Sequence, residues 1–305
     1  NFDFIGNDIL ILEKDGNIRL VKDGMLVQEP IKKIDVSTTL EEGLLGILTK
    51  DEFVYLHYTT RDPDSDLTSN WFYKFTWDGD TLTEPHLIKE IHGGSYIHNS
   101  GVMEIFNDQI VMTIGDLSNR DGITQNNLDG GFDHTSVIIP IEPVDEPIAI
   151  GIRNSFGLAF DPITGNLWDT ENGQVCCDEI NLVTENFNSG WALVQGMANE
   201  NSISVIPKIE NFEYSNPEFT WDQVNAPTAL AIPGNNWGEK YQNSLFVSDY
   251  IFGKIYKFEL NDSRDGFVFQ DPSLQDLIFH EGDNSDEIIF ATEFGRISDM
   301  KFGPN

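Results

Sequence analysis

The residues best suited to chemistry fall in two short polar segments. His98 begins the sequence His98-Asn99-Ser100-Gly101, and an imidazole can act as a base because it exchanges a proton near neutral pH. The second segment contains Arg153 and Asn154, and a guanidinium binds carboxylates through two parallel hydrogen bonds. Each residue also has a structural interpretation. His98 could bond to turn backbone, which is the stronger interpretation for this residue taken alone, and Arg153 could pair with one of the chain's 51 acids.

The two cysteines, Cys176 and Cys177, are adjacent. They cannot link distant segments, so they form a vicinal disulfide, stay reduced or bind a soft metal. The sequence contains no G-x-S-x-G, Walker, H-E-x-x-H or C-x-x-C motif. The motifs of serine hydrolases, P-loop nucleotide-binding proteins, zinc proteases and dithiol oxidoreductases are therefore missing.

Composition excludes several classes of protein. The chain has 305 residues and a formal net charge of −33, while 39% of its residues are hydrophobic. That hydrophobic content is enough for a core and argues against bulk disorder. A chain this acidic repels phosphate backbones and anionic lipids, so we expect no nucleic-acid partner. No stretch approaches the roughly 18 to 20 apolar residues of a spanning helix.

The elements that must position these residues are predicted to be strands. Apolar runs of four to six residues recur between Gly, Asp and Asn, whereas apolar residues at helical spacing are scarce. The runs 9–12 and 18–21 flank an Asp15-Gly16 turn and predict a hairpin. Similar runs at 54–59, 71–75 and 110–114 predict further strands. The sequence therefore indicates an all-β protein.

Segments 167–172, 245–258 and 288–300 resemble the first hairpin. Each contains an apolar strand with a polar residue at its end, and the last two continue through a glycine turn and a basic residue into a second strand. Such repeats are typical of a β-propeller. Six blades of about 51 residues would account for the length, so we expect one domain, 1–305, of six four-stranded antiparallel blades. A β-sandwich or two stacked barrels is the alternative. In a propeller, the polar strand ends converge on one face.

A family resemblance emerges from residues 151–168, which read GIRNSFGLAFDPITGNLW. The stretch resembles G-x-R-N-P-x-G-x-x-x-D-P-x-T-G-x-L-W of the soluble quinoprotein glucose/sorbosone dehydrogenase family, which includes the aldose sugar dehydrogenases. Segments 42–47, 98–101, 113–116, 178–181, 188–191 and 295–299 are similar to further motifs of that family, in the same order. The resemblance implies a six-bladed propeller, pyrroloquinoline quinone (PQQ), Ca²⁺ and secretion.

The resemblance also implies an activity and its catalytic residues. The family oxidises an aldose at its C1 hydroxyl to the lactone, with hydride transfer to the quinone and an external electron acceptor. His98 matches the general base of the family. Asp116 matches an acid near that base, where a carboxylate could orient the imidazole; its structural interpretation is a strand-end turn cap.

Cofactor and metal contacts follow from the same resemblance. Arg153 and Asn154 match a pair that binds the quinone, and Asn172 and Arg296 are expected beside it. A tricarboxylated quinone needs local positive charge inside a chain of this net charge. In the family's E-x-G-P loop, backbone carbonyls bind Ca²⁺. Here these are the carbonyls of Gly173 and Gln174, which are the expected metal ligands.

Three positions depart from the family pattern. Gln174 stands where the family has proline in the calcium loop. Ser298 replaces the second basic residue of G-R-I-R-D, and Ile251 stands near the position of a quinone-binding lysine. A hydrogen bond to a charged group contributes about 1.5 to 3 kcal/mol, so two missing cations could weaken quinone binding by about a hundredfold or more.

Two other functions therefore remain open. One is a non-catalytic or divergent propeller that binds a ligand, glycan or partner protein. The other is a quinone-free, Ca²⁺-dependent lactonase-like hydrolase. Because the resemblance implies export, we expect an extracellular or periplasmic location and favour the disulfide. The chain begins at Asn1 and ends within a motif, so both ends are expected to be trimmed. The sequence predicts neither the sugar nor the oligomeric state.

Overall fold

The computed structural model describes residues 1–118, 134–144, 146–209 and 211–303. Within these ranges β-strands predominate, as predicted. The α-helices are single turns, α1 (Glu200–Ile203) and α2 (Glu239–Gln242), and two 3-10 helices, η2 (Asn235–Trp237) and η3 (Pro272–Leu274), complete the helical elements described. In the part of the chain that the structure describes, no helix has the length and hydropathy of a membrane span.

The amino-terminal part of the chain forms two sheets. The first contains β1 (Phe2–Ile5), β2 (Asp8–Leu12), β3 (Asn17–Lys22) and β4 (Met25–Leu26), and β5 (Lys32–Lys33) pairs with β3. The second is a meander of β6 (Leu44–Lys50), β7 (Phe53–Arg61), β8 (Thr68–Trp77) and β9 (Leu82–Gly94). The predicted hairpin 9–21 is β2 and β3, which pair antiparallel from Ile9↔Val21 to Leu12↔Ile18.

Three further sheets recruit strands across longer distances in sequence. The third runs β10 (Met103–Phe106), β11 (Gln109–Ile114), β12 (Val137–Glu142), β13 (Ala149–Ile150), β17 (Phe187–Asn188) and β18 (Glu213–Tyr214). The fourth runs β14 (Ser155–Phe160), β15 (Leu167–Glu171), β16 (Asp178–Val183), β19 (Phe219–Trp221) and β23 (Ile278–Phe279). The fifth runs β20 (Pro227–Ala231), β21 (Ser244–Asp249), β22 (Ile255–Glu259) and β24 (Ile289–Ala291).

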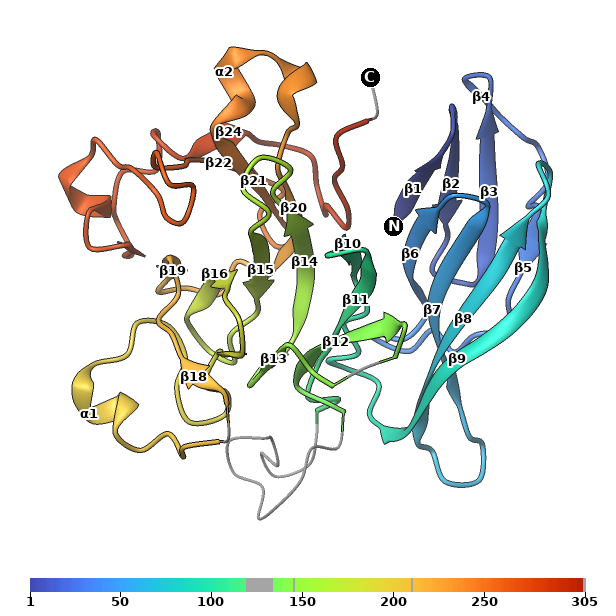
Figure 1. Cartoon of the computed structure of the whole chain (residues 1–305), viewed down its shortest axis with the longest axis horizontal. Coiled ribbons are helices and arrows are strands. Elements are labelled where there is room, and N and C mark those ends of the chain that lie inside the picture. Colours follow the sequence, from blue (N-terminus) through green and yellow to red (C-terminus); the bar gives the residue numbers. More distant parts are fainter. Residues whose placement is uncertain (119–133, 145, 210, 304–305) are drawn as a thin grey trace.

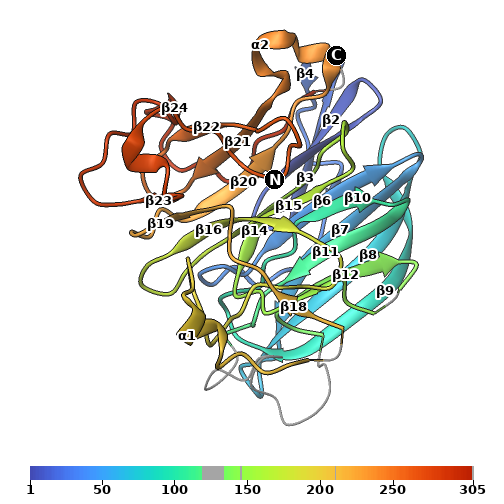
Figure 2. The same ribbon diagram turned by 60° about the vertical axis from the view of Figure 1, so that its left-hand side comes forward.

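The first strands of these sheets contact one another in the sequence β1, β6, β10, β14 and β20 (Figures 1 and 2). Between β20 and β1 lies the segment 297–301. Thr228 Oγ1 donates to the Ile297 carbonyl at 2.7 Å, and Lys301 Nζ lies 3.0 Å from Asp3 Oδ1. Sheets whose first strands lie next to one another around a common centre form a β-propeller, which confirms the predicted all-β propeller fold.

The predicted number of six blades is wrong, because the described strands form five sheets. One cause is that the expected hairpin at 288–300 does not form. Its first half, β24, is three residues long and is the last strand of the fifth sheet, antiparallel to β22. Residues 292–303 form no strand. Equal blades of consecutive residues are also not observed, because β17, β18 and β23 join sheets whose first strands lie much earlier in the chain.

The core lies between neighbouring sheets. Strand β15 is buried along its whole length, and β11 and β12 are each buried apart from one end residue, as expected of strands covered on both faces. Between the fourth and fifth sheets, Trp168, Phe219, Trp221 and Phe258 form an aromatic cluster. Rigid packing on both sides of β14 and β15 fixes the ends of these strands, where the polar residues of the site stand.

Candidate active site

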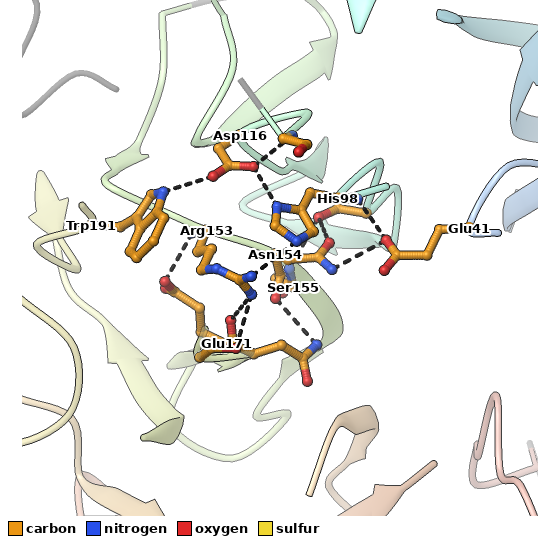
Figure 3. A network of polar contacts seen from close by, with 12 residues as sticks. Glu41, His98, Asp116, Arg153, Asn154, Ser155, Glu171 and Trp191 are labelled. Carbon is orange, nitrogen blue, oxygen red and sulfur yellow. Dashed lines mark hydrogen bonds and ion pairs between the residues drawn. The ribbon is translucent and has the colours of Figure 1, made fainter. Parts of the chain in front are cut away.

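A cavity of about 510 Å³ opens beside the first strands of the sheets. It brings together four of the predicted site residues, which come from the turn before β10, the start of β14 and the end of β15 (Figure 3). These four are His98, Arg153, Asn154 and Asn172. The predicted convergence of polar strand ends is therefore what the structure shows.

His98 and Asp116 are in direct contact (Figure 3). His98 Nδ1 lies 2.6 Å from Asp116 Oδ1, and the two side chains are 12% and 6% exposed. A carboxylate only accepts, so Nδ1 carries a proton, and the tautomer of the neutral ring that fits this contact has its lone pair on Nε2. Asp116 Oδ1 also accepts from the Ser118 backbone N–H at 2.8 Å. The acid therefore fixes the tautomer and the plane of the imidazole.

Local backbone conformation explains why these two side chains meet. His98 has a φ of +61°, a left-handed conformation that non-glycine residues seldom adopt. Gly115 comes so close to the His98 carbonyl that a Cβ at residue 115 would lie 2.2 Å from the oxygen. At Gly101, a Cβ would lie 1.7 Å from His57 Nδ1. Gly115 thus lets the turn of His98 approach the segment that leads from β11 to Asp116, and Gly101 lets the same turn pack against His57.

Arg153 lies against the other side of the imidazole. Its Nη2 is 3.0 Å from His98 Nε2, and its Nη1 donates to the carbonyls of Asn172 at 2.7 Å and Gly173 at 3.0 Å. Its Nε is buried without a partner. Burial lowers the pKa of the Arg153 guanidinium, an effect that nearby Asp116 and Glu171 oppose. The base nitrogen of His98 is therefore covered by a cation in this conformation.

The asparagine side chains are held by the surrounding backbone and side chains. Asn154 Oδ1 accepts from Ser100 Oγ at 3.0 Å. Asn172 Nδ2 donates to the carbonyls of Asn154 and Pro227, both at 3.3 Å, while its Oδ1 is buried without a partner. Asn172 and Arg153 both line the cavity, and each has a buried polar atom without a partner, which a polar ligand could satisfy.

Two cavity residues were missed by the sequence analysis. Glu41 Oε2 accepts from the His98 backbone N–H at 2.6 Å and from Asn154 Nδ2 at 3.3 Å. Lys14 also lines the cavity, and its ammonium group donates to the Leu40 carbonyl. The available signal was position, because Glu41 directly precedes the motif at 42–47 and Lys14 stands in the turn of the first hairpin.

The predicted calcium loop does not fit a calcium ion in this conformation. The Gly173 carbonyl accepts from Arg153, so a metal ion bound to it would lie beside a guanidinium. Gln174 is exposed, and its N–H donates to Gln195 Oε1 at 2.8 Å. The described residues contain no cluster of three or more His, Cys, Asp or Glu side chains suited to a metal ion. In the same loop, Cys176 and Cys177 form the vicinal disulfide.

Arg296 lies outside the cavity wall. Its Nη1 is 3.3 Å from the hydroxyl of Tyr250, and its guanidinium lies 5.1 Å from the centre of that ring. Tyr250 itself lines the cavity, as does Ser298. Ile251 is 51% exposed. The structure therefore places Arg296 in contact with Tyr250 and outside the set of residues that line the cavity.

Three buried acids lie directly beneath the site. Glu171 and Glu179 face each other across β15 and β16, and Asp169 lies two residues before Glu171 on β15. Glu171 Oε1 accepts from the Arg153 backbone N–H at 2.8 Å, and Glu171 Oε2 accepts from Ser189 Oγ at 2.7 Å. Burial raises the pKa of Glu171 to about 7 and the pKa values of Asp169 and Glu179 well above their usual range.

Because of these buried acids, we expect the unfolding free energy to fall as pH rises. Because the pKa values of these acids are raised in the folded chain, the folded chain binds more protons than the unfolded chain from about pH 4.5 upward. For each additional proton that the folded chain binds, the unfolding free energy falls by up to about 1.4 kcal/mol per pH unit. The substitution Glu179→Gln should reduce the loss of unfolding free energy between pH 5 and pH 8, by at most about 1.4 kcal/mol per pH unit for one proton. Denaturant titrations at both pH values measure it. The exposed Glu213→Gln is the control, and equal slopes for both variants would contradict the prediction.

The chain is similar to known proteins over most of its length. The profile of the glucose/sorbosone dehydrogenase family matches residues 1–279, so the chain belongs to that family. An uncharacterized protein of Synechocystis is 27% identical over 302 residues, which cover 84% of this chain and 71% of that protein. Quinoprotein glucose dehydrogenase B of Acinetobacter calcoaceticus is 30% identical over 196 residues, which cover 51% of this chain and 41% of the relative. The match thus spans less than half of that dehydrogenase.

Solved structures share the fold. A crystal structure of glucose dehydrogenase superimposes with a TM-score of 0.77 at 18% identity, and covers 99% of this chain and 90% of that one. The PQQ-bound aldose sugar dehydrogenase of Streptomyces coelicolor gives a TM-score of 0.70 at 20% identity, covering 98% of this chain and 82% of that one. At these identities the likeness shows the fold alone.

Proposed function

We propose that the chain is a quinoprotein sugar dehydrogenase that oxidises an aldose at its C1 hydroxyl to the lactone. The observation that carries the proposal is His98, which lines the cavity with its Nδ1 held by Asp116 and stands beside Arg153. An oriented imidazole next to a cation in a polar cavity suits removal of a hydroxyl proton while an anionic cofactor takes the hydride.

The proton step belongs to His98 and Asp116. The lone pair on Nε2 would accept the C1 hydroxyl proton, and the Asp116 carboxylate, 2.6 Å from Nδ1, would stabilise the imidazolium that forms. Nε2 must first lose its hydrogen bond from Arg153 Nη2. An anionic group in the cavity would draw the guanidinium toward itself, so that binding of the group and release of the base would occur together.

PQQ fits the donors of the cavity. Arg153 and Lys14 would supply positive charge to its carboxylates, and Asn154 and Asn172 would supply amide groups. The unpartnered Arg153 Nε and Asn172 Oδ1 would gain partners. When bound, PQQ would accept the hydride that leaves C1. The role of Arg296 would be indirect, through the Tyr250 hydroxyl.

The proposal extends to location and partners. A disulfide such as Cys176–Cys177 persists in oxidising compartments, which supports an extracellular or periplasmic site of action. The substrate would be a small sugar, and an external acceptor would take the electrons from the reduced quinone. The carbonyls of Gly173 and Gln174 would be available to Ca²⁺ only after Arg153 has moved.

A second candidate is a propeller that binds a ligand without redox chemistry. It is favoured by Ser298 in the cavity wall, where the family has a basic residue, and by the exposed Ile251, near the position of a lysine. Losing both cations weakens the attraction for a tricarboxylate. A neutral or less charged ligand would then suit the cavity better.

The test is a titration of the chain with PQQ, followed by absorbance, with Ca²⁺ and separately with a chelator. Aldoses and an artificial electron acceptor are added afterwards. Binding at micromolar concentration with sugar-dependent reduction of the quinone would support the proposal. Failure to bind at millimolar PQQ in both conditions would sink it and leave the ligand-binding propeller. Lactone hydrolysis that needs Ca²⁺ and no quinone would point instead to the hydrolase alternative.

A further inference from the structure

The segment 188–191 resembles a family motif but supplies no residue to the proposed proton transfer. Its last residue, Trp191, is 8% exposed and lies at the site (Figure 3). The indole Nε1 donates to Asp116 Oδ2 at 2.8 Å. The other oxygen of the same carboxylate, Oδ1, contacts His98 Nδ1. Trp191 and His98 therefore hold the two oxygens of one buried carboxylate.

The backbone around Trp191 is built to place the indole. The Trp191 N–H donates to the Gly151 carbonyl at 3.1 Å, just before the segment that carries Arg153. Gly190 has a φ of +98°, and a Cβ there would lie 2.8 Å from the Tyr214 ring. Asn188 Oδ1 accepts from the Gly190 N–H at 2.9 Å. Asn188 and Gly190 thus fix the backbone conformation that places Trp191.

The same ring also touches the second functional group. The guanidinium carbon of Arg153 lies 5.3 Å from the centre of the Trp191 ring, within the range of a cation–π contact. The cation that covers His98 Nε2 and the acid that holds His98 Nδ1 are thus both anchored on one side chain.

We propose that Trp191 is a positioning residue for the His98 base, acting through Asp116. Its N–H fixes one carboxylate oxygen so that the other stays aimed at His98 Nδ1, which keeps the proton on Nδ1 and the lone pair on Nε2. The catalytic part of this inference rests on the proposed function, whereas the control of the imidazole tautomer does not.

Trp191→Phe tests the inference because it keeps an aromatic side chain and removes the indole N–H that donates to Asp116. The matched control is Trp71→Phe, which removes an indole N–H that donates to Thr60 Oγ1, also at 2.8 Å, in the second sheet. In the chain without cofactor, ¹⁵N NMR reports the tautomer of each of the six histidines, and the His98 signal is identified by its loss in His98→Asn. We expect a single Nδ1–H tautomer in the wild type and in Trp71→Phe, and a mixture of both tautomers in Trp191→Phe.

Kinetics give the second readout. Loss of one hydrogen bond to a charged group should lower kcat by about tenfold to a hundredfold, with KM changed less than about threefold. If Trp191 acts through Asp116, adding Trp191→Phe to Asp116→Asn should lower kcat by less than about twofold more. If Trp191→Phe lowered kcat by the same factor in the Asp116→Asn variant as in the wild type, the inference would be overturned.

The outcomes separate the two proposals. A tautomer change without any sugar oxidation in the wild type would support the positioning by Trp191 and contradict the proposed function. An unchanged tautomer and kcat in Trp191→Phe, with an active wild type, would overturn the inference and leave the function standing. If Trp191→Phe does not fold, 3-benzothienylalanine at position 191 keeps the shape of the indole and removes the N–H, and the same two readouts decide.

Discussion

Replacing His98 by asparagine is expected to lower kcat for aldose oxidation by about 10²- to 10⁴-fold, the usual contribution of a general base. Asparagine keeps a polar group in the turn but has no nitrogen lone pair to accept the C1 proton. Binding of PQQ should remain, because the groups proposed to hold it are Arg153, Lys14 and the two asparagines. Steady-state kinetics and the absorbance titration measure the two effects separately.

His92→Asn is the control for this substitution. His92 is largely exposed, and its ring contacts Ser69 Oγ and Glu90 in the second sheet, away from the cavity. It should leave kcat within about twofold, as is usual for surface substitutions. A His98→Asn variant that turned over as fast as His92→Asn would exclude His98 as the base. A variant that lost PQQ binding as well would show that the imidazole contacts the cofactor rather than only the sugar.

The strands could be predicted from the sequence because their apolar runs and Asp-Gly turns are local signals. The runs at 9–12, 54–59 and 110–114 fall within β2, β7 and β11. The number of sheets could not be predicted in this way. Whether residues 288–291 begin a new sheet or end the fifth depends on which strand they pair with, and β22 offers the partner edge.

The candidate site was partly predictable for a similar reason. His98, Asp116, Arg153 and Asn154 stand in motifs whose glycines impose close backbone approach, so their spacing carries information. For Glu41 the sequence offers only its position next to the motif at 42–47, and no local pattern reveals that its carboxylate reaches the His98 N–H. The covering of the base nitrogen by Arg153 was equally hidden, since it depends on side-chain conformation.

The longest motif, 151–168, combines two separate tasks. Its first part supplies Arg153 and Asn154 to the cavity. Its second part forms a turn in which Asp161 Oδ1 accepts from the Ile163 N–H at 2.9 Å, and Oδ2 accepts from Thr164 Oγ1 at 2.9 Å. Asp161 is fully buried and lies after β14, outside the cavity wall. A family pattern therefore marks this acid as strongly as the site residues, although its contacts are structural.

Asp161 forms a buried ion pair with Arg264, and we expect a large loss of stability when this pair is broken. Arg264, which follows β22 in the fifth sheet, contacts both carboxylate oxygens, with Nε at 2.6 Å from Oδ2 and Nη2 at 3.1 Å from Oδ1. Its Nη1 donates to the Gln242 carbonyl at 2.9 Å. Burial alone would raise the pKa of Asp161, but hydrogen bonds from Arg264 and the Ile163 N–H hold it below its usual range. The pair thus joins the fourth and fifth sheets through a charge that cannot reach water.

We expect Arg264→Met to lower the unfolding free energy by about 3 to 5 kcal/mol, because it leaves the Asp161 carboxylate buried and unpaired. Denaturant titration at neutral pH measures the loss. Lys22→Met is the control, since it breaks the exposed ion pair with Asp80 and should cost less than about 1 kcal/mol. Adding Asp161→Asn to Arg264→Met should restore part of the stability by removing the unpaired charge. If the double variant were as unstable as the sum of the single variants, the loss would come from packing of the arginine stem, and the ion pair would not be what holds the two sheets together.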